Sequence, residues 1–84
     1  MDALQHQTGS MPIIRPGRST GTVRWYSAEK GYGFIAPEEG DEDVFVRFSA
    51  IESSGFRTLD AGKVVTFITA TDARGPRAIE VRGA

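Results

Sequence analysis

Two segments rich in aromatic residues lie near the middle of the chain: Lys30-Gly31-Tyr32-Gly33-Phe34-Ile35 and, after an acidic turn, Val44-Phe45-Val46-Arg47-Phe48. In an extended strand, successive side chains point to opposite faces of the sheet. Tyr32 and Phe34 therefore share one face of the first strand, and the intervening residues share the other face.

The second segment obeys the same alternation. Phe45 and Arg47 lie on one face, and the two valines lie on the opposite face, which suits a core. If the aliphatic faces of both strands point inward, Tyr32, Phe34, Phe45 and Arg47 form a ladder of flat side chains on the outside of adjacent strands. Single-stranded nucleic acid uses such ladders for base stacking.

The neighbouring glycines favour this outward assignment. Aromatic side chains in strands are most often core residues, because Phe and Tyr have strong β-propensity. Burial of the aromatic face would expose Gly31 and Gly33 to solvent at an entropic cost, whereas glycines that face a tight barrel interior let strands approach closely. Arg47 agrees with this assignment, since a guanidinium is costly to bury but can stack on a base or contact a phosphate.

Length and composition indicate one small domain. The chain has 84 residues, a modest core is expected, and there is no cysteine to form a disulfide or a thiolate metal site. No apolar run approaches the roughly 18 residues of a membrane span, and the N-terminus lacks a signal-peptide pattern. These features predict a soluble, cytoplasmic protein.

The net charge of -1 differs from that of most duplex-binding proteins, which carry a strongly basic face. The basic residues Arg24, Lys30 and Arg47 nevertheless lie among the aromatic residues, and five of the 11 acidic residues cluster in the turn 38–43. Binding that depends mainly on stacking tolerates a neutral total. We interpret the acidic turn as solvated rather than as a metal site, because no His or Cys joins it.

Turn and strand patterns divide the chain into a flexible leader, 1–19, and a domain, 20–84. The leader can include an expression-tag remnant or an alternative start at Met11, and Ile13 and Ile14 are expected to do no more than pack locally. Strands are expected at 20–27, 32–36, 44–48, 64–71 and 77–82, with a helical turn at 49–52. Five short strands separated by turns predict a small closed barrel.

Two aromatic residues stay ambiguous at this level. Alternation pairs Trp25 with Val23 in the core unless a β-bulge or strong twist turns the strand. Phe56 lies in the polar loop 53–59 and is either a plug over the barrel end or an exposed stacking group.

The chain resembles the bacterial cold-shock proteins from about Thr20 to Val81. The resemblance is carried by Gly21-Thr22-Val23-Arg24-Trp25-Tyr26, by the two segments quoted above extended to Ile51, and by Arg74-Gly75-Pro76. It implies an all-β, five-stranded antiparallel OB-fold barrel, the cold-shock domain, whose second and third strands carry the ribonucleoprotein motifs. It also implies that Trp25 is exposed and stacks on a base.

The resemblance further implies which residues bind nucleic acid. Matched position by position, they are Arg24, Trp25, Lys30, Tyr32, Phe34, Asp43, Phe45, Phe48 and Phe56, with Arg74 as a backbone contact. Arg47 joins them through its place on the ladder. The sequence departs from the family at Arg47, where His is usual, at Tyr26 and Tyr32, where Phe is usual, at Ser27, where Asn is usual, and at Thr69, where an inward aliphatic residue is usual.

The leading functional hypothesis is a non-enzymatic, sequence-tolerant binder of single-stranded RNA and DNA. The resemblance implies a monomeric RNA chaperone or a cold-shock and stress adaptation factor that affects transcription or translation. No cofactor, metal, membrane or small-molecule substrate is expected. The alternative is a small-barrel module that docks a proline-rich peptide in its aromatic groove. No catalytic residue is expected, because His6 lies in the leader, cysteine is absent, and Ser49 has no evident base partner.

Overall fold

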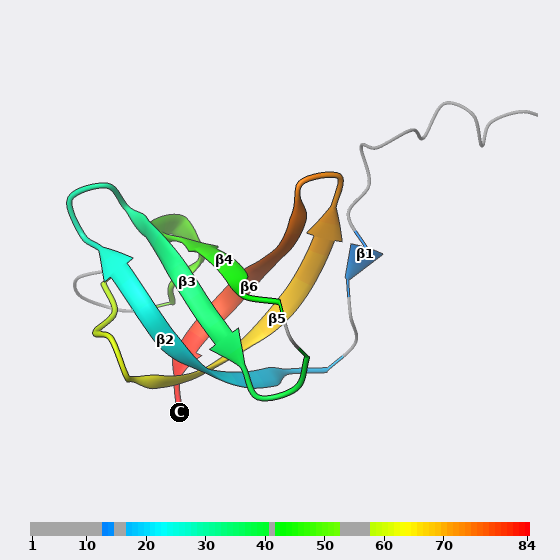
Figure 1. Cartoon of the computed structure of the whole chain (residues 1–84), viewed down its shortest axis with the longest axis horizontal. Coiled ribbons are helices and arrows are strands. Elements are labelled where there is room, and N and C mark those ends of the chain that lie inside the picture. The colour runs from blue at the N-terminus through cyan, green and yellow to red at the C-terminus, as the bar shows by residue number, and fades with distance from the viewer. Residues whose placement is uncertain (1–12, 15–16, 41, 53–57) are drawn as a thin grey trace, which may run out of the picture.

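The computed structural model describes residues 13–14, 17–40, 42–52 and 58–84. Within these residues the regular elements are six strands and one short 3₁₀ helix (Figure 1). The strands are β1 (Ile13–Ile14), β2 (Ser19–Ser27), β3 (Tyr32–Pro37), β4 (Val44–Arg47), β5 (Val64–Asp72) and β6 (Gly75–Gly83), and the 3₁₀ helix spans Phe48–Ala50.

Strands β2 to β6 form a closed barrel. β2, β3 and β4 make an antiparallel meander, and β5 pairs antiparallel with both β2 and β6. β6 then pairs with β4, in parallel, and closes the barrel. Closure pairs each of these strands on both sides over part of its length, so little free sheet edge remains along the ring. The predicted all-β class and five-stranded OB-fold barrel are confirmed, with a parallel pair at the closing seam.

The barrel interior is filled by aliphatic side chains and one phenylalanine. The largest side chains with almost no exposed surface are Phe67, Ile35, Val23, Val46, Val65 and Val81. In β4, Val44 and Val46 are buried, Phe45 is partly exposed and Arg47 is exposed, as alternation predicts. Thr69 is paired in register with the buried Ala78 and is itself only partly exposed, so it stands on the core side as expected.

The two glycines of the first motif have different roles. Gly33 is buried, and a Cβ atom there would lie 2.2 Å from the carbonyl oxygen of Trp25 on β2. Gly31 instead lies in the turn before β3 with a φ of +79°, a left-handed conformation that favours glycine. The expected close approach at the barrel interior is therefore confirmed for Gly33, but the same expectation for Gly31 is wrong.

The short strand β1 lies beside β5 in Figure 1, outside the barrel. Ile13 pairs with Thr71, and Ile14 pairs with Ala70. β5 can accept β1 because its first half pairs with β2 and its last residues are left free on that side. Only local packing was expected of these two isoleucines, and this pairing was not predicted.

Candidate nucleic-acid interface

A β-bulge in β2 places Trp25 on the outer face of the barrel. Val23 pairs with Ile35, but the next paired residue, Trp25, already faces Phe34, so Arg24 is the extra residue of the bulge. As a result Val23 is only 2% exposed, whereas Trp25 is 43% exposed. A β-bulge was the one exception to burial of Trp25 that alternation allowed, and it turns Trp25 away from the core.

Trp25 joins Tyr32, Phe34 and Phe45 in a continuous surface of rings, which we call the aromatic platform. The ring centroids of Trp25 lie 5.7 Å from those of Tyr32 and 5.5 Å from those of Phe34. The Phe45 ring lies 5.6 Å from each of the same two rings. Every one of these four residues keeps part of its surface exposed, so three adjacent strands present one aromatic surface to solvent.

Arg47 extends the aromatic platform at one margin. Its guanidinium carbon lies 5.3 Å from the centroid of the Phe45 ring, within the range of a cation–π contact. Arg47 is also paired in register with Tyr32 on β3. The predicted ladder is therefore present, with Arg47 exposed on the same face as the rings.

Phe48 lies at another margin, beside the β2–β3 turn. Its backbone N–H donates to the carbonyl of Gly31 at 2.8 Å, and its ring is 49% exposed. Lys30 lies in the same turn and is exposed, and its backbone N–H donates to the hydroxyl of Ser27 at 3.1 Å. Both predicted residues are thus available at the surface, next to each other and to one end of β3.

Arg24 and Asp43, both predicted as binding residues, form an ion pair with each other. The Arg24 Nε atom lies 2.7 Å from Oδ1 of Asp43. Both side chains remain partly exposed, at 58% and 35%. The Asp43 carboxylate offsets part of the positive charge that Arg24 offers to a phosphate.

Arg74 lies in the two-residue turn between β5 and β6. Its backbone N–H donates to Oδ1 of Asp72 at 2.9 Å. The residue is exposed. That amide, and next the charge of Arg77, hold the pKa of Asp72 below its usual value. Phe56, the remaining predicted residue, lies outside the described residues.

A groove of about 570 Å³ separates the aromatic platform from the β5–β6 hairpin. It is lined by residues of β3, β4 and β6 and of the turns that flank them, among them Phe34, Phe45, Asp43, Arg47, Arg74 and Arg77. Arg77 was not predicted as a site residue. Alternation in β6 puts it on the face opposite the buried Ala78, but the sequence gives no register between β6 and β4.

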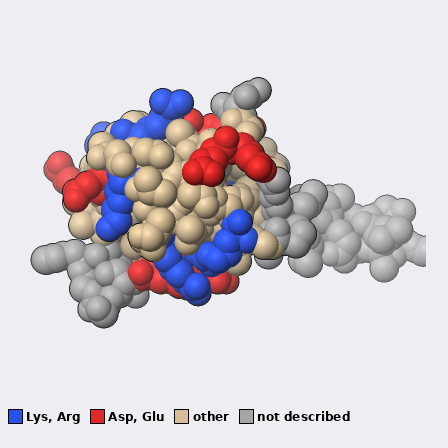
Figure 2. Space-filling model, turned by 90° about the horizontal axis from the view of Figure 1, so that it is seen from below, with Lys and Arg blue, Asp and Glu red and all other residues tan. Residues whose placement is uncertain are grey.

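Charges of both signs are mixed on the face of the molecule that Figure 2 shows. In the view of Figure 2, from below that of Figure 1, Lys and Arg side chains alternate with Asp and Glu around an uncharged middle. The mixed signs on this face agree with the net charge of -1 and differ from the strongly basic face of a duplex binder.

Tyr26, where the cold-shock family usually has Phe, packs against the core and is not one of the rings of the aromatic platform. Partial burial raises the pKa of its hydroxyl.

Within the part of the chain that the structure describes, no group of three or more His, Cys, Asp or Glu side chains could hold a metal ion. Nor is any helix in these residues long and apolar enough to cross a membrane.

The barrel, the ring surface on β2 to β4 and the motifs that build it define a cold-shock domain. Residues 19–84 match the family described as 'Cold-shock' DNA-binding domain, and the chain belongs to this family. It is therefore a member of a family of nucleic-acid-binding proteins, as the resemblance implied.

Individual relatives are similar over nearly their whole length. Cold shock-like protein CspLB of Listeria monocytogenes is 58% identical over 62 residues, which cover 74% of this chain and 92% of the relative. Cold shock-like protein CspB of Escherichia coli is 50% identical over 64 residues, 76% and 90% of the two chains. Cold shock-like protein CspA of Bordetella pertussis is 48% identical over 63 residues, 75% and 94% of the two chains.

Proposed function

We propose that this protein binds single-stranded RNA and DNA by stacking successive bases on the aromatic platform, with little dependence on sequence at most positions. The observation that carries the proposal is the continuity of the platform: four rings from three strands lie 5.5 to 5.7 Å apart and are all partly exposed. Every base has a π-face, so stacking tolerates any sequence.

The energetics of stacking favour this mode over one that depends on phosphate contacts. Each base stacked on an aromatic side chain contributes roughly 1 to 3 kcal/mol, so three or four such contacts suffice for tight binding. The ion pair between Arg24 and Asp43 reduces one of the few charges available for phosphates. Lys30, Arg47 and Arg74 form no ion pair with another described residue and supply the backbone contacts in this proposal.

The physiological role that follows is that of an RNA chaperone in cold-shock or stress adaptation. A base that is stacked on the platform is held away from its pairing partner, so weak RNA structure melts or fails to form, which affects transcription or translation. The names of the relatives support the link to cold shock. We further propose that the protein acts as a cytoplasmic monomer and that it catalyses no reaction.

Paired substitutions on the two faces of the sheet test the proposal. Phe34→Ala removes a central ring, which should weaken binding of oligothymidine by about ten- to a hundredfold and cost little stability. Val46→Ala on the inner face of β4 should do the reverse, because it opens a cavity in a small core and lowers the melting temperature. Trp25 fluorescence reports the titrations, and thermal melts report folding.

Two results would count against the proposal. If Phe34→Ala unfolds the domain while the folded fraction binds normally, the ring is structural. If a proline-rich peptide quenches Trp25 saturably and oligothymidine does not, the platform is a peptide-docking surface, the alternative that the aromatic groove also allows.

A further inference from the structure

The groove beside the aromatic platform contains Arg77, which was not predicted to bind nucleic acid. Trp25 pairs with Phe34 across β2 and β3, and Phe34 pairs with Phe45 across β3 and β4. Phe45 in turn pairs with Arg77 across β4 and β6. Directly paired residues in a sheet project from the same face. Arg77 is therefore the fourth member of a row in which the first three members are the rings of the platform.

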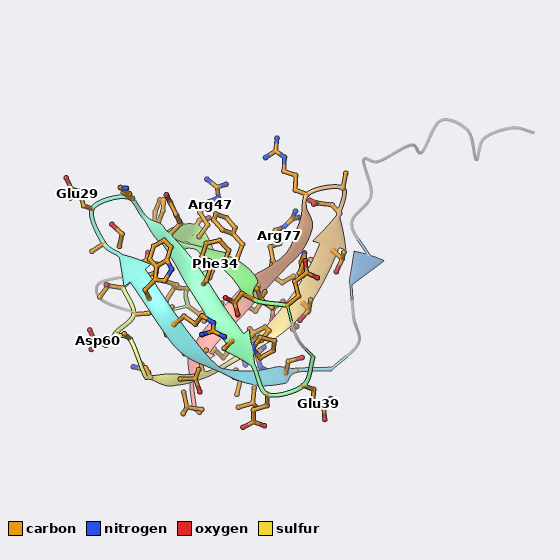
Figure 3. All side chains as sticks on the ribbon, in the orientation of Figure 1. Glu29, Phe34, Glu39, Arg47, Asp60 and Arg77 are labelled. Atoms are coloured by element: carbon orange, nitrogen blue, oxygen red, sulfur yellow. The ribbon has the colours of Figure 1, made fainter. Side chains whose placement is uncertain are left out.

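The aliphatic part of Arg77 has a defined place in this row. On its other side Arg77 pairs with Ala70 of β5, which is 1% exposed. The small alanine leaves room above it for the stem of Arg77, whose side chain keeps 41% of its surface exposed. Figure 3 shows the labelled Arg77 on the side of Phe34 and Arg47 that faces the β5–β6 hairpin. The guanidinium thus lies within the groove, at the end of the ring surface.

Asp72 holds the guanidinium of Arg77 in position. Oδ2 of Asp72 accepts a hydrogen bond from Nη1 of Arg77, and Oδ1 of Asp72 accepts the backbone N–H of Arg74. An arginine has five N–H donors in a planar fork. One contact to a fixed carboxylate therefore reduces the side-chain entropy that binding would cost and leaves other donors of the fork for a ligand.

The charges that line the groove argue against a phosphate as that ligand. The cations are Arg47, Arg74 and Arg77, and the anions are Glu42, Asp43 and Asp72. Of the three cations, Arg77 is the one that is ion-paired within the groove, with Asp72, so its guanidinium offers a phosphate less net attraction than Arg47 and Arg74, which are unpaired among the described residues. A base edge, which is neutral and carries both donors and acceptors, does not face this penalty.

We propose that Arg77, positioned by Asp72, reads guanine at one position of the bound single strand, where the base lies beyond or against Phe45. Arginine binds O6 and N7 of guanine with two hydrogen bonds. Adenine and cytosine offer an amino donor on the corresponding edge, which faces the donors of Arg77, and thymine offers a single acceptor. The inference rests on the function proposed above and adds one discriminating position to an otherwise tolerant strand.

The test uses oligothymidine heptamers in which one guanine is moved through all seven positions. At one position guanine should bind about tenfold tighter than thymine, which is within the range of a bidentate base contact. Replacement of that guanine by 7-deazaguanine, which lacks the N7 acceptor, should remove the preference. The Kd values of the 7-deazaguanine heptamer and of oligothymidine should then differ by no more than about threefold. This probe leaves the protein unchanged.

Variants then assign the preference to the side chains. Arg77→Ala and Arg77→Gln should both abolish the guanine-to-thymine ratio, and Asp72→Asn should reduce it. The matched control is Arg82→Ala, which removes an arginine of the same strand that pairs with Glu52 and Glu80 and does not line the groove. The ratio in Arg82→Ala should equal that of the wild type. Thermal melts establish that each variant is folded.

The outcomes separate a failure of the proposed guanine contact of Arg77 from a failure of the proposed stacking function. If no position favours guanine by more than about threefold, or if Arg77→Ala and Arg77→Gln keep the preference, the role of Arg77 is refuted. The stacking function survives that result as long as oligothymidine binds and Phe34→Ala weakens it. If the wild type binds none of the heptamers, both proposals are refuted.

Discussion

Substitution of Gly33 by alanine tests whether close packing of β2 and β3 holds the platform together. The added Cβ would lie 2.2 Å from the carbonyl oxygen of Trp25 and 2.7 Å from Cα of Tyr26. Both obstacles are backbone atoms, and real Cβ contacts essentially never fall below 3.0 Å. The two strands must therefore separate by about 0.8 Å, which stretches a normal backbone hydrogen bond beyond its useful range.

The expected loss of stability follows from these distances. Overpacking of this kind costs about 1 to 3 kcal/mol, and one lost backbone hydrogen bond costs about 1 kcal/mol more. The total of about 2 to 4 kcal/mol is a large part of the roughly 4 to 12 kcal/mol expected for a domain of 84 residues. We expect Gly33→Ala to lower the melting temperature by at least about 8 °C.

The assay is thermal unfolding followed by far-UV circular dichroism, with Gly83→Ala as the control. Gly83 lies in β6, and a Cβ there would meet only the flexible end of Lys63, at 3.3 Å from Cε. The control should melt within about 3 °C of the wild type, as most surface substitutions do. A Gly33→Ala protein that also melts within that interval would refute the reasoning, because the strands would then tolerate the added atom.

Three further predictions concern charge. Arg47→His should bind oligothymidine within about threefold of the wild type, because imidazole can also stack, whereas Arg47→Glu should weaken binding at least about tenfold in the same titration. The slope of log K against log salt should have a magnitude of about 2, because single strands give about 0.7 per neutralised phosphate and only three of the predicted cations are unpaired among the described residues. A slope magnitude above about 3 would mean that phosphate contacts dominate binding. The pKa of Asp72 is lowered in the folded state, so its contribution to stability is fully present above the ordinary carboxyl pKa of about 4 and is lost as the pH falls further. Melting temperatures of wild type and Asp72→Asn should accordingly differ by a constant amount from pH 7 to about 5 and converge below about 4.

The face assignment of β3 and β4 could be predicted from local sequence alone. Alternation is strict in these strands, and the valines of β4 leave only one reasonable inner face. The ring contacts among Tyr32, Phe34 and Phe45 follow directly from that assignment and from the antiparallel register.

Trp25 required more than alternation. A bulge changes the face of every following residue, and nothing in the composition of β2 specifies where the extra residue lies. The resemblance to cold-shock proteins was therefore needed to predict an exposed tryptophan. The ion pair that Arg24 forms with Asp43 escaped prediction for the same reason, because it depends on where the bulge directs Arg24.

The place of Arg77 beside the aromatic platform could not be predicted from local sequence. Its importance comes from pairing with Phe45, a residue about 30 positions earlier in the chain, on a strand that is not its sequence neighbour. The pairing of β1 with the end of β5 is unpredictable on the same ground, because two isoleucines in a polar segment carry no periodicity.

The parallel seam between β4 and β6 also has a consequence for the order of folding. The meander from β2 to β4 needs only short turns, and the β5–β6 hairpin needs a turn of two residues, so both can form early at small entropic cost. The seam joins segments about 30 residues apart and is made after a much longer loop has closed. Substitutions in the seam, such as Val46→Ala, should therefore accelerate unfolding more than they slow folding, and the groove lined by Phe45 and Arg77 should be among the last features to assemble.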